Sequence, residues 1–164
     1  YTHAAIWATM AFAELGDSAR AWELLRMINP VNHGIDAAQM DVYKVEPYVV
    51  SADVYAVEPH IGRGGWSWYT GSAGWMYRLI VESLLGLRLE AGKLRFAPVL
   101  PAEWDGFSLD YRHRDTRYWI RVRQSEAGTL GTVWLDGVAQ ADGCIPLVDD
   151  GVEHSVELNH PRTS

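Results

Sequence analysis

The chain has 164 residues and a formal net charge of −7, with 48% hydrophobic and 21% charged residues, a composition typical of one or two folded domains. This acidic balance argues against a nucleic-acid partner, because no surplus of Lys and Arg is available to neutralise phosphates. No apolar run approaches the roughly 20 residues that cross a bilayer, so we expect the chain itself to be soluble.

The first residues have the pattern of a helical hairpin. Residues 5–15 and 19–28 are predicted helices. Gly16 suits the position after the first helix, and Asp17 or Ser18 can cap the second through a side-chain oxygen. The first helix is apolar on nearly every side, which indicates that it needs partners all round.

Three further segments extend the helical part of the chain. Residues 37–45 give a weaker helical prediction. Residues 48–56 are ambiguous between helix and strand, and we favour helix because of the neighbouring segments. Residues 73–87 strongly predict a helix that ends near Gly86.

After Gly92 the pattern changes to short alternating segments rich in β-branched and aromatic residues. Five or six strands at this spacing predict a small antiparallel β-sandwich. The fold class is therefore α+β by segregation, with helices in residues 1–90 and the sandwich in residues 91–164. Turn-forming pairs separate the strands: Asp105-Gly106, Asp136-Gly137, Asp142-Gly143 and Asp150-Gly151.

Metal and cysteine chemistry are not expected. The single cysteine, Cys144, cannot form a disulfide within the chain, which favours a reducing compartment. The six histidines lack the spacing of zinc ligands and have no cysteine partner, so we expect no metal site.

The segment GRGGWSWYTGSAGWMYR, residues 62–78, combines glycines with bulky aromatic residues. Its stretch from Thr70 to Gly74 precedes the strong helix, whose first turn offers unpaired amides and the positive end of the helix dipole to an anion. The alternative is an ordinary N-cap by Thr70 or Ser72. The segment matches neither a P-loop nor a dinucleotide-binding fingerprint.

Aromatic residues flank the same stretch. Their rings can pack against the C–H face of a sugar, while Tyr and Trp keep a polar edge for hydroxyl groups. Plain core packing is the alternative, which we expect for Trp75 and Tyr77 and less for Trp66. We expect the glycines of 62–74 to make room for a ligand that the aromatic residues wall in. Candidate sugar contacts are Trp66, Tyr69 and Ser72.

YKVEPYVVSADVY, followed by WYTGSAGW, ESLLGL and a later L…P.LP..W.GF, resembles the C-terminal region of the family-94 glycoside phosphorylases. The resemblance is greatest to the phosphorylase-like C-terminal part of cyclic β-1,2-glucan synthases. It implies the last helices of an (α/α)6 barrel followed by a small β-sandwich. It also implies that the chain is the C-terminal piece of a larger protein.

The resemblance also implies a reaction and a phosphate pocket. Family members cleave a β-glucosidic bond by inverting phosphorolysis, with inorganic phosphate as co-substrate and no other cofactor. Thr70 and Gly71 match the family's phosphate-binding pair, and His3 in YTHAAIW matches its phosphate-binding histidine. We therefore expect His3 to lie beside Thr70 and Gly71. The family's general acid lies upstream of Tyr1, so no catalytic residue is expected here and the isolated chain should be inactive.

Two other functions stay open: a non-catalytic carbohydrate-binding or scaffolding module, and a glucoamylase-like hydrolase on the same barrel. The expected partners are a β-glucan or glucosyl oligosaccharide, phosphate and the rest of the parent chain. Apolar surface around residues 4–13 should make the isolated chain self-associate. The parent chain is expected at the cytoplasmic side of a bacterial inner membrane, anchored by its other segments.

Overall fold

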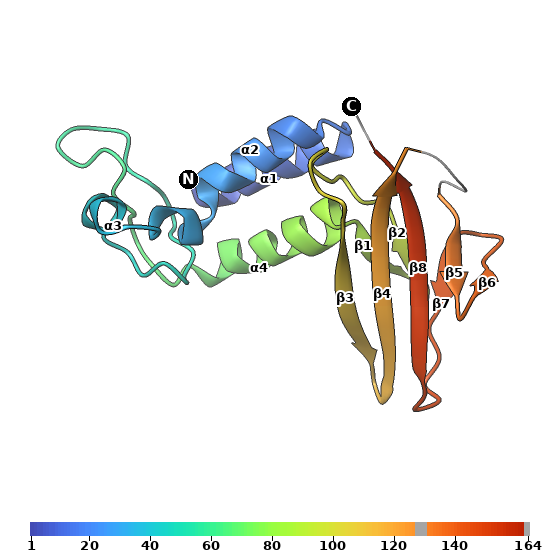
Figure 1. The fold of residues 1–164 in the computed structure, drawn as a ribbon. Helices are drawn as coiled ribbons and strands as arrows, with labels where there is room; N and C mark the ends of the chain where they lie inside the picture. The colour runs from blue at the N-terminus through green and yellow to red at the C-terminus, as the bar shows by residue number, and fades with distance from the viewer. Residues whose placement is uncertain (127–130, 163–164) are drawn as a thin grey trace. The chain divides into compact units, whose positions relative to one another are not determined.

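A computed structural model describes residues 1–126 and 131–162, and it divides into two compact units, Tyr1–Leu84 and Leu85–Ser164 (Figure 1). Helices occupy the first unit and strands the second, which agrees with the expected α+β class. Residues 87–90, which we expect among the helices, form a strand instead. Gly86 has a φ of 71° there, a left-handed conformation that ends the helix and favours glycine.

The helical unit begins with the predicted hairpin. Gly16, with a φ of 75°, follows the first helix, and the Asp17 carboxylate accepts a hydrogen bond from the Arg20 amide at the start of the second. Buried apolar side chains from both hairpin helices and from the last two helical segments form one core, which includes Ile6, Leu25 and Leu79. The elements are α1 (Thr2–Glu14), α2 (Ser18–Ile28), η1 (Pro30–His33), α3 (Ala37–Tyr43), α4 (Thr70–Arg78) and η2 (Leu79–Leu84), the last a π-helical segment.

The helix expected over residues 48–56 is wrong. This segment runs alongside residues 62–66 instead: the Ala52 amide donates to the Trp66 carbonyl, and the Tyr55 amide donates to the Arg63 carbonyl. Val54 and Gly64 form an antiparallel bridge between them. Long-range pairing thus satisfies the backbone groups that a helix would have satisfied locally.

Helix α1 has the apolar exposed surface that the sequence predicts. Ala4, Trp7, Ala8 and Ala11 recur at helical spacing and are exposed, and 52% of Trp7 is accessible to solvent. None of the helices in the described part of the chain is long and apolar enough to traverse a bilayer.

The strand unit contains two sheets (Figure 1). One has the order β1-β2-β7 and the other β3-β4-β8-β5-β6. The expectation of a purely antiparallel arrangement is wrong, because β4 and β8 pair in parallel, with Ile120 opposite Val156. The strands are β1 (Leu87–Glu90), β2 (Lys93–Phe96), β3 (Gly106–His113), β4 (Thr116–Ser125), β5 (Val133–Leu135), β6 (Val138–Ala139), β7 (Cys144–Pro146) and β8 (Glu153–Pro161).

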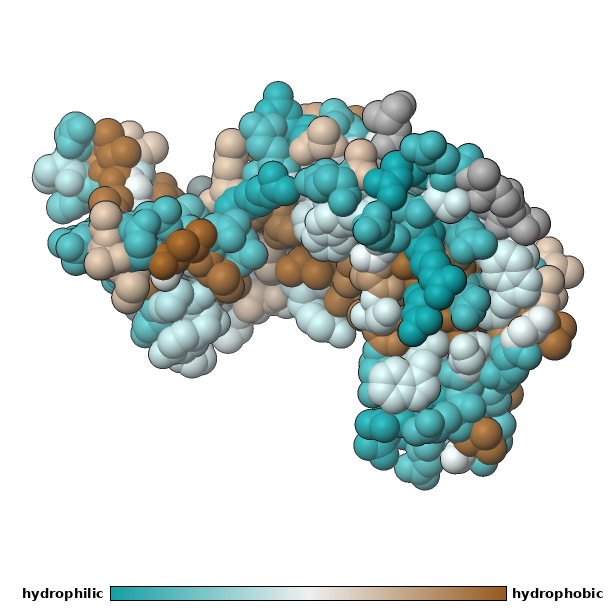
Figure 2. Space-filling view, viewed as in Figure 1, coloured by the Kyte–Doolittle hydropathy of each residue, from teal (hydrophilic) through white to brown (hydrophobic). Residues whose placement is uncertain are grey.

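Strand β4 alternates strictly between the core and the solvent. Tyr118, Ile120 and Val122 are buried, whereas the residues between them are exposed, as the two-residue period of a strand requires. Figure 2 shows hydrophilic residues over β4 and β8 on the face in view. The exposed residues of β4 are Arg117, Trp119, Arg121 and Arg123.

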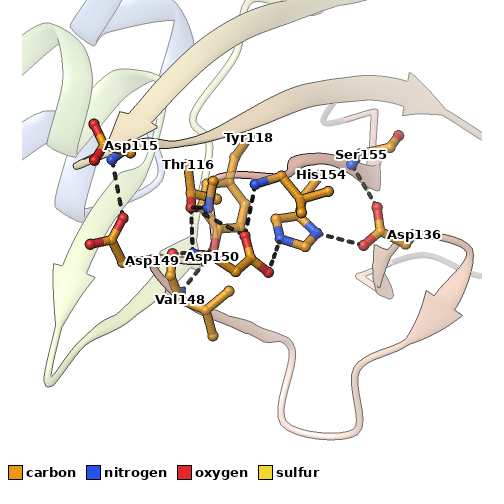
Figure 3. A network of polar contacts seen from close by, with 11 residues as sticks. Asp115, Thr116, Tyr118, Asp136, Val148, Asp149, Asp150, His154 and Ser155 are labelled. Carbon is orange, nitrogen blue, oxygen red and sulfur yellow. Dashed lines mark hydrogen bonds and ion pairs between the residues drawn. The ribbon is translucent and has the colours of Figure 1, made fainter.

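A network of hydrogen bonds joins β4 and β8 to the loops around them (Figure 3). The Thr116 hydroxyl accepts from the Asp150 and Gly151 amides at 2.8 and 2.9 Å. The Tyr118 hydroxyl accepts from the Val148 amide at 2.8 Å. These bonds fix the loop that leads into β8 against β4, and they hold the parallel pair in register.

His154 completes this network with two carboxylates. Its Nδ1 lies 2.7 Å from Asp136 and its Nε2 lies 3.3 Å from Asp150, so donation to both requires the protonated ring. Asp136 also accepts from the Ser155 amide at 2.8 Å. Asp136 and Gly137 both have positive φ, as the predicted two-residue hairpin turn between β5 and β6 requires.

These contacts shift three pKa values in favour of the charged forms. The hydrogen bond to Asp136 raises the pKa of His154 above its ordinary value of 6.5. The hydrogen bond from His154 lowers the pKa of Asp136, and backbone hydrogen bonding at Val152 lowers that of Asp150, both from an ordinary 3.8. The His154 contribution to stability is therefore complete below pH 6.5 and is lost as the pH rises through its folded pKa. The two carboxylate contributions are lost as the pH falls through their folded values.

We predict that His154→Asn destabilises the strand unit most in mildly acidic solution, and less as the pH rises, because the imidazolium contribution is then absent from the wild type as well. The difference in the free energy of unfolding between the two proteins is measured by urea unfolding between about pH 5 and pH 9. The unfolding is followed by NMR on the amide signals of β8. Burial lowers the pKa of His160, which titrates in both proteins. Its contribution to the pH dependence of stability therefore cancels when the two proteins are compared. A difference that does not change with pH would contradict this role of His154.

Candidate functional site

The N-terminus of α4 has no side-chain cap. Tyr69 occupies the N-cap position without a capping hydrogen bond, so the expected alternative of a cap by Thr70 or Ser72 is wrong. The Ala73 amide makes the first helical hydrogen bond, to the Tyr69 carbonyl. The amides of Thr70, Gly71 and Ser72 precede that bond, and they present the positive end of the helix dipole.

His3 lies beside this helix terminus, as expected from the sequence. A Cβ atom added to Gly71 would stand 3.9 Å from His3 Cε1, which is ordinary van der Waals contact. The proximity arises because α1 packs against α4 and η2 in the helical core, with Ile6 of α1 and Met76 of α4 both buried there. Gly71 therefore leaves the His3 ring close to the backbone at the start of α4.

Two buried polar atoms at this point have no hydrogen-bond partner among the described residues. They are His3 Nε2 and Ser72 Oγ, and the Ser72 residue is 0% exposed. Buried polar groups in native proteins are nearly always paired, because an unpaired one costs about 1–3 kcal/mol. Both atoms lie at the uncapped start of α4.

Aromatic rings surround His3, and sequence reasoning missed two of them. The Trp7 ring lies 4.8 Å from the His3 ring, between centroids, and Tyr1 stacks on it at 5.9 Å. Trp75 of α4 lies 6.0 Å away and meets Trp7 edge-to-face at 5.6 Å. The i, i+4 spacing of His3 and Trp7 on one helix face was the available signal for Trp7.

The predicted sugar contacts differ in their surroundings. Trp66 is 78% exposed in the loop before α4. Tyr69 is half-buried, and its hydroxyl lies 3.3 Å from that of Tyr1. Trp75 packs against the core as expected, but the expectation of core packing for Tyr77 is wrong, since 67% of it is exposed.

Most glycines of the 62–74 segment lie against the protein itself. A Cβ at Gly65 would collide with the Asp53 carboxylate, and one at Gly62 or Gly64 would press on Val42 or Val45. The expectation that these glycines make room for a ligand is therefore wrong for those three. Gly71 and Gly74 lack such contacts and leave the start of α4 open.

The arrangement suits an oxyanion. The first amides of an uncapped helix point outward and favour an anion, and Ser72 Oγ and His3 Nε2 lie unpaired at the same helix start. The described residues contain no group of three or more His, Cys, Asp or Glu residues that could hold a metal ion.

Two family models match successive parts of the chain. Residues 1–86 match the model of the glycosyl hydrolase 94 superfamily catalytic domain, and residues 87–128 match the glycosyl hydrolase family 65 C-terminal domain. The chain is 50% identical over 78% of its length to the cyclic beta-(1,2)-glucan synthase NdvB of Rhizobium meliloti (strain 1021), of which it covers 5%.

Two phosphorylases are also similar. The chain is 30% identical over 96% of its length to the N,N'-diacetylchitobiose phosphorylase of Vibrio furnissii, covering 20% of that protein. It is 32% identical over 65% of its length to the 1,2-beta-oligoglucan phosphorylase of Listeria innocua, covering 11%. The chain thus spans a small part of each relative. Its first unit, with the uncapped α4 and His3, falls in the catalytic-domain match, and the chain belongs to the glycosyl hydrolase 94 superfamily.

Proposed function

We propose that this chain supplies the phosphate-binding side of the active site in a larger enzyme that processes β-1,2-glucans by inverting phosphorolysis. The observation that carries the proposal is the pair of buried, unpartnered polar atoms, His3 Nε2 and Ser72 Oγ, at the uncapped start of α4. The names of two relatives, a β-1,2-glucan synthase and a 1,2-β-oligoglucan phosphorylase, support the choice of substrate.

In this reaction phosphate itself is the nucleophile. It attacks the anomeric carbon of a glucosyl unit while a carboxylic acid protonates the leaving oxygen. The α4 amides, Thr70, Ser72 and His3 hold the anion in line and balance its charge. No general base is needed, because the nucleophile is already an anion.

The carboxylic acid belongs to other segments of the proposed enzyme, since no residue of this chain matches it. The chain alone is therefore proposed to bind phosphate without turnover. The exposed apolar face of α1, with Trp7 and Ala8, would pack against further barrel helices of the same enzyme. The proposed enzyme would lie at the cytoplasmic side of a bacterial inner membrane, anchored by its other segments.

Sugar contacts are proposed on the loop that leads into α4. Trp66 offers an exposed indole face to a glucosyl ring, and the Tyr69 hydroxyl, already close to that of Tyr1, offers a polar edge. Both residues lie within a few positions of Thr70, so a sugar placed there would meet the bound phosphate.

We predict that Thr70→Val weakens phosphate use in the complete enzyme with little effect on folding. Thr70 is exposed, and the change removes a hydroxyl at nearly constant volume. A lost bond to a charged group costs about 1.5–3 kcal/mol, or roughly a tenfold or greater rise in half-saturating phosphate. Phosphorolysis rates titrated against phosphate measure the effect.

The matched control is Tyr77→Phe, which removes an exposed hydroxyl from the same helix away from its N-terminus. Its phosphate dependence should stay at the wild-type value. If Thr70→Val kept that value too, Thr70 would have no part in phosphate binding. Turnover independent of phosphate would instead identify a hydrolase.

We predict opposite effects on stability from two buried serines. Ser72→Ala removes an unpaired hydroxyl, so the melting temperature should stay constant or rise while phosphate binding weakens. Ser51→Ala removes the partner of the Tyr43 hydroxyl, 3.2 Å away, and should destabilise the chain by about 1 kcal/mol. Calorimetric melting with and without phosphate tests both variants, and a large loss of stability in Ser72→Ala would show that Ser72 is a structural residue.

A further inference from the structure

We propose that the outer face of the five-stranded sheet carries a second saccharide site, centred on Trp134, that holds a glucan chain apart from the phosphate site. A cavity of about 300 Å³ opens on this face, at the lower end of the size range of small-molecule pockets. The choice of a β-glucan as ligand rests on the proposed function. Six residues line the cavity: Arg123, Trp134, Gly137, Ser155, Glu157 and Asn159.

The strand register brings these side chains to one face. Trp134 of β5 is opposite Glu157 of β8, and Arg123 of β4 is opposite Asn159 of β8. Residues directly opposite each other in a sheet share a face. The buried neighbours Val122, Val156 and Leu158 point to the other face, so the cavity lies on the solvent side of the sheet.

The lining has the chemistry of a site for a neutral polyol. The Trp134 indole offers an aromatic surface for the C–H face of a sugar ring. Arg123 and Asn159 supply donors for hydroxyl groups, and Glu157 and Asn159 supply acceptors. Within the described part of the chain, no hydrogen bond or ion pair engages the side chains of Arg123, Glu157 or Asn159.

The charges of the cavity favour a neutral ligand over an anion. Its described lining has one cation, Arg123, and one anion, Glu157, so an incoming phosphate or carboxylate would meet a carboxylate at close range. This is the opposite of the start of α4, where amides and a helix dipole favour an anion. The cavity therefore favours a neutral saccharide, whereas the start of α4 favours an anion.

The cavity wall is held in place before any ligand binds. Asp136 accepts from the Ser155 amide and lies 2.7 Å from His154 Nδ1, which fixes the β5–β6 turn that contains Gly137 (Figure 3). A preformed wall reduces the ordering cost of binding. Weak but specific binding of a short glucan is the expected result.

The experiment titrates the chain with a short linear β-1,2-linked gluco-oligosaccharide, followed on the tryptophan indole N–H signals by NMR. We expect the Trp134 signal to move in the wild type, and Trp134→Ala to weaken binding about tenfold or more. Trp119→Ala is the matched control, because Trp119 is an exposed tryptophan on the same face outside the cavity. It should keep the wild-type affinity.

If Trp134→Ala does not fold, saccharide binding by Glu157→Gln tests the proposal instead. This change keeps the side-chain volume and removes the charged acceptor. We expect it to weaken binding about threefold or more. Absence of saccharide binding in the wild type, or unchanged binding in Trp134→Ala or in folded Glu157→Gln, overturns the proposal, as does an equal loss in Trp119→Ala.

Inorganic phosphate, titrated separately, keeps this proposal distinct from the proposed function. Phosphate should shift signals at Gly71 and Ser72 and leave Trp134 unchanged. Saccharide binding without phosphate binding would contradict only the proposed function. Phosphate binding without a Trp134 response to the saccharide would contradict only the second site.

Discussion

The packing of α1 against α4 and η2 is the constraint on which the candidate site depends. His3 and Gly71 are far apart in the sequence, and no local interaction brings them together. Ile6, one turn after His3, and Met76, one turn after Ser72, are both buried in the same core. The hydrophobic contact that stabilises the helices thereby sets the position of the histidine at the helix terminus. A shift of either helix would separate the groups that we propose to share one anion.

In the strand unit, polar contacts position the loops and strands, as hydrophobic packing positions the helices in the helical unit. Its loops carry carboxylates that accept hydrogen bonds from backbone amides across the sheet, and Asp136 and Asp150 both reach His154. Each such hydrogen bond stabilises the fold only modestly, but together they fix the positions of the edge strands and of the central strands of the sheet. The helical unit thus leaves buried polar atoms unpaired at its proposed ligand site, whereas hydrogen bonds of Asp136 with His154 and Ser155 hold the wall of the proposed saccharide cavity.

The local elements could be predicted from the sequence where local signals decide the structure. Gly16 and Asp17 mark the hairpin, and the alternation of β4 separates its buried and exposed faces. The segment 48–56 could not be assigned in this way, because its partner is a remote loop whose glycines permit close approach. Alternation also shows which face of a strand is buried but not which strand lies beside it, so the parallel β4–β8 pair was not foreseen. The proximity of His3 to Gly71 is expected from family resemblance alone, and helical spacing could have placed Trp7 beside His3, whereas the Trp134 cavity needed the three-dimensional arrangement.

The parallel pairing of β4 with β8 also has a consequence for the order in which the sheet is completed. The β3–β4 hairpin can form from neighbouring residues, but the other edge of β4 stays unpaired until β8 has been synthesised. During that interval Tyr118, Ile120 and Val122 lack the cover that β8 later helps to provide. The exposed arginines on the opposite face of the same strand put like charges on any copy that approaches it, and such charges discourage edge-to-edge association of nascent chains. Until β8 pairs with it, that edge of β4 would therefore be guarded only by the charges of Arg117, Arg121 and Arg123.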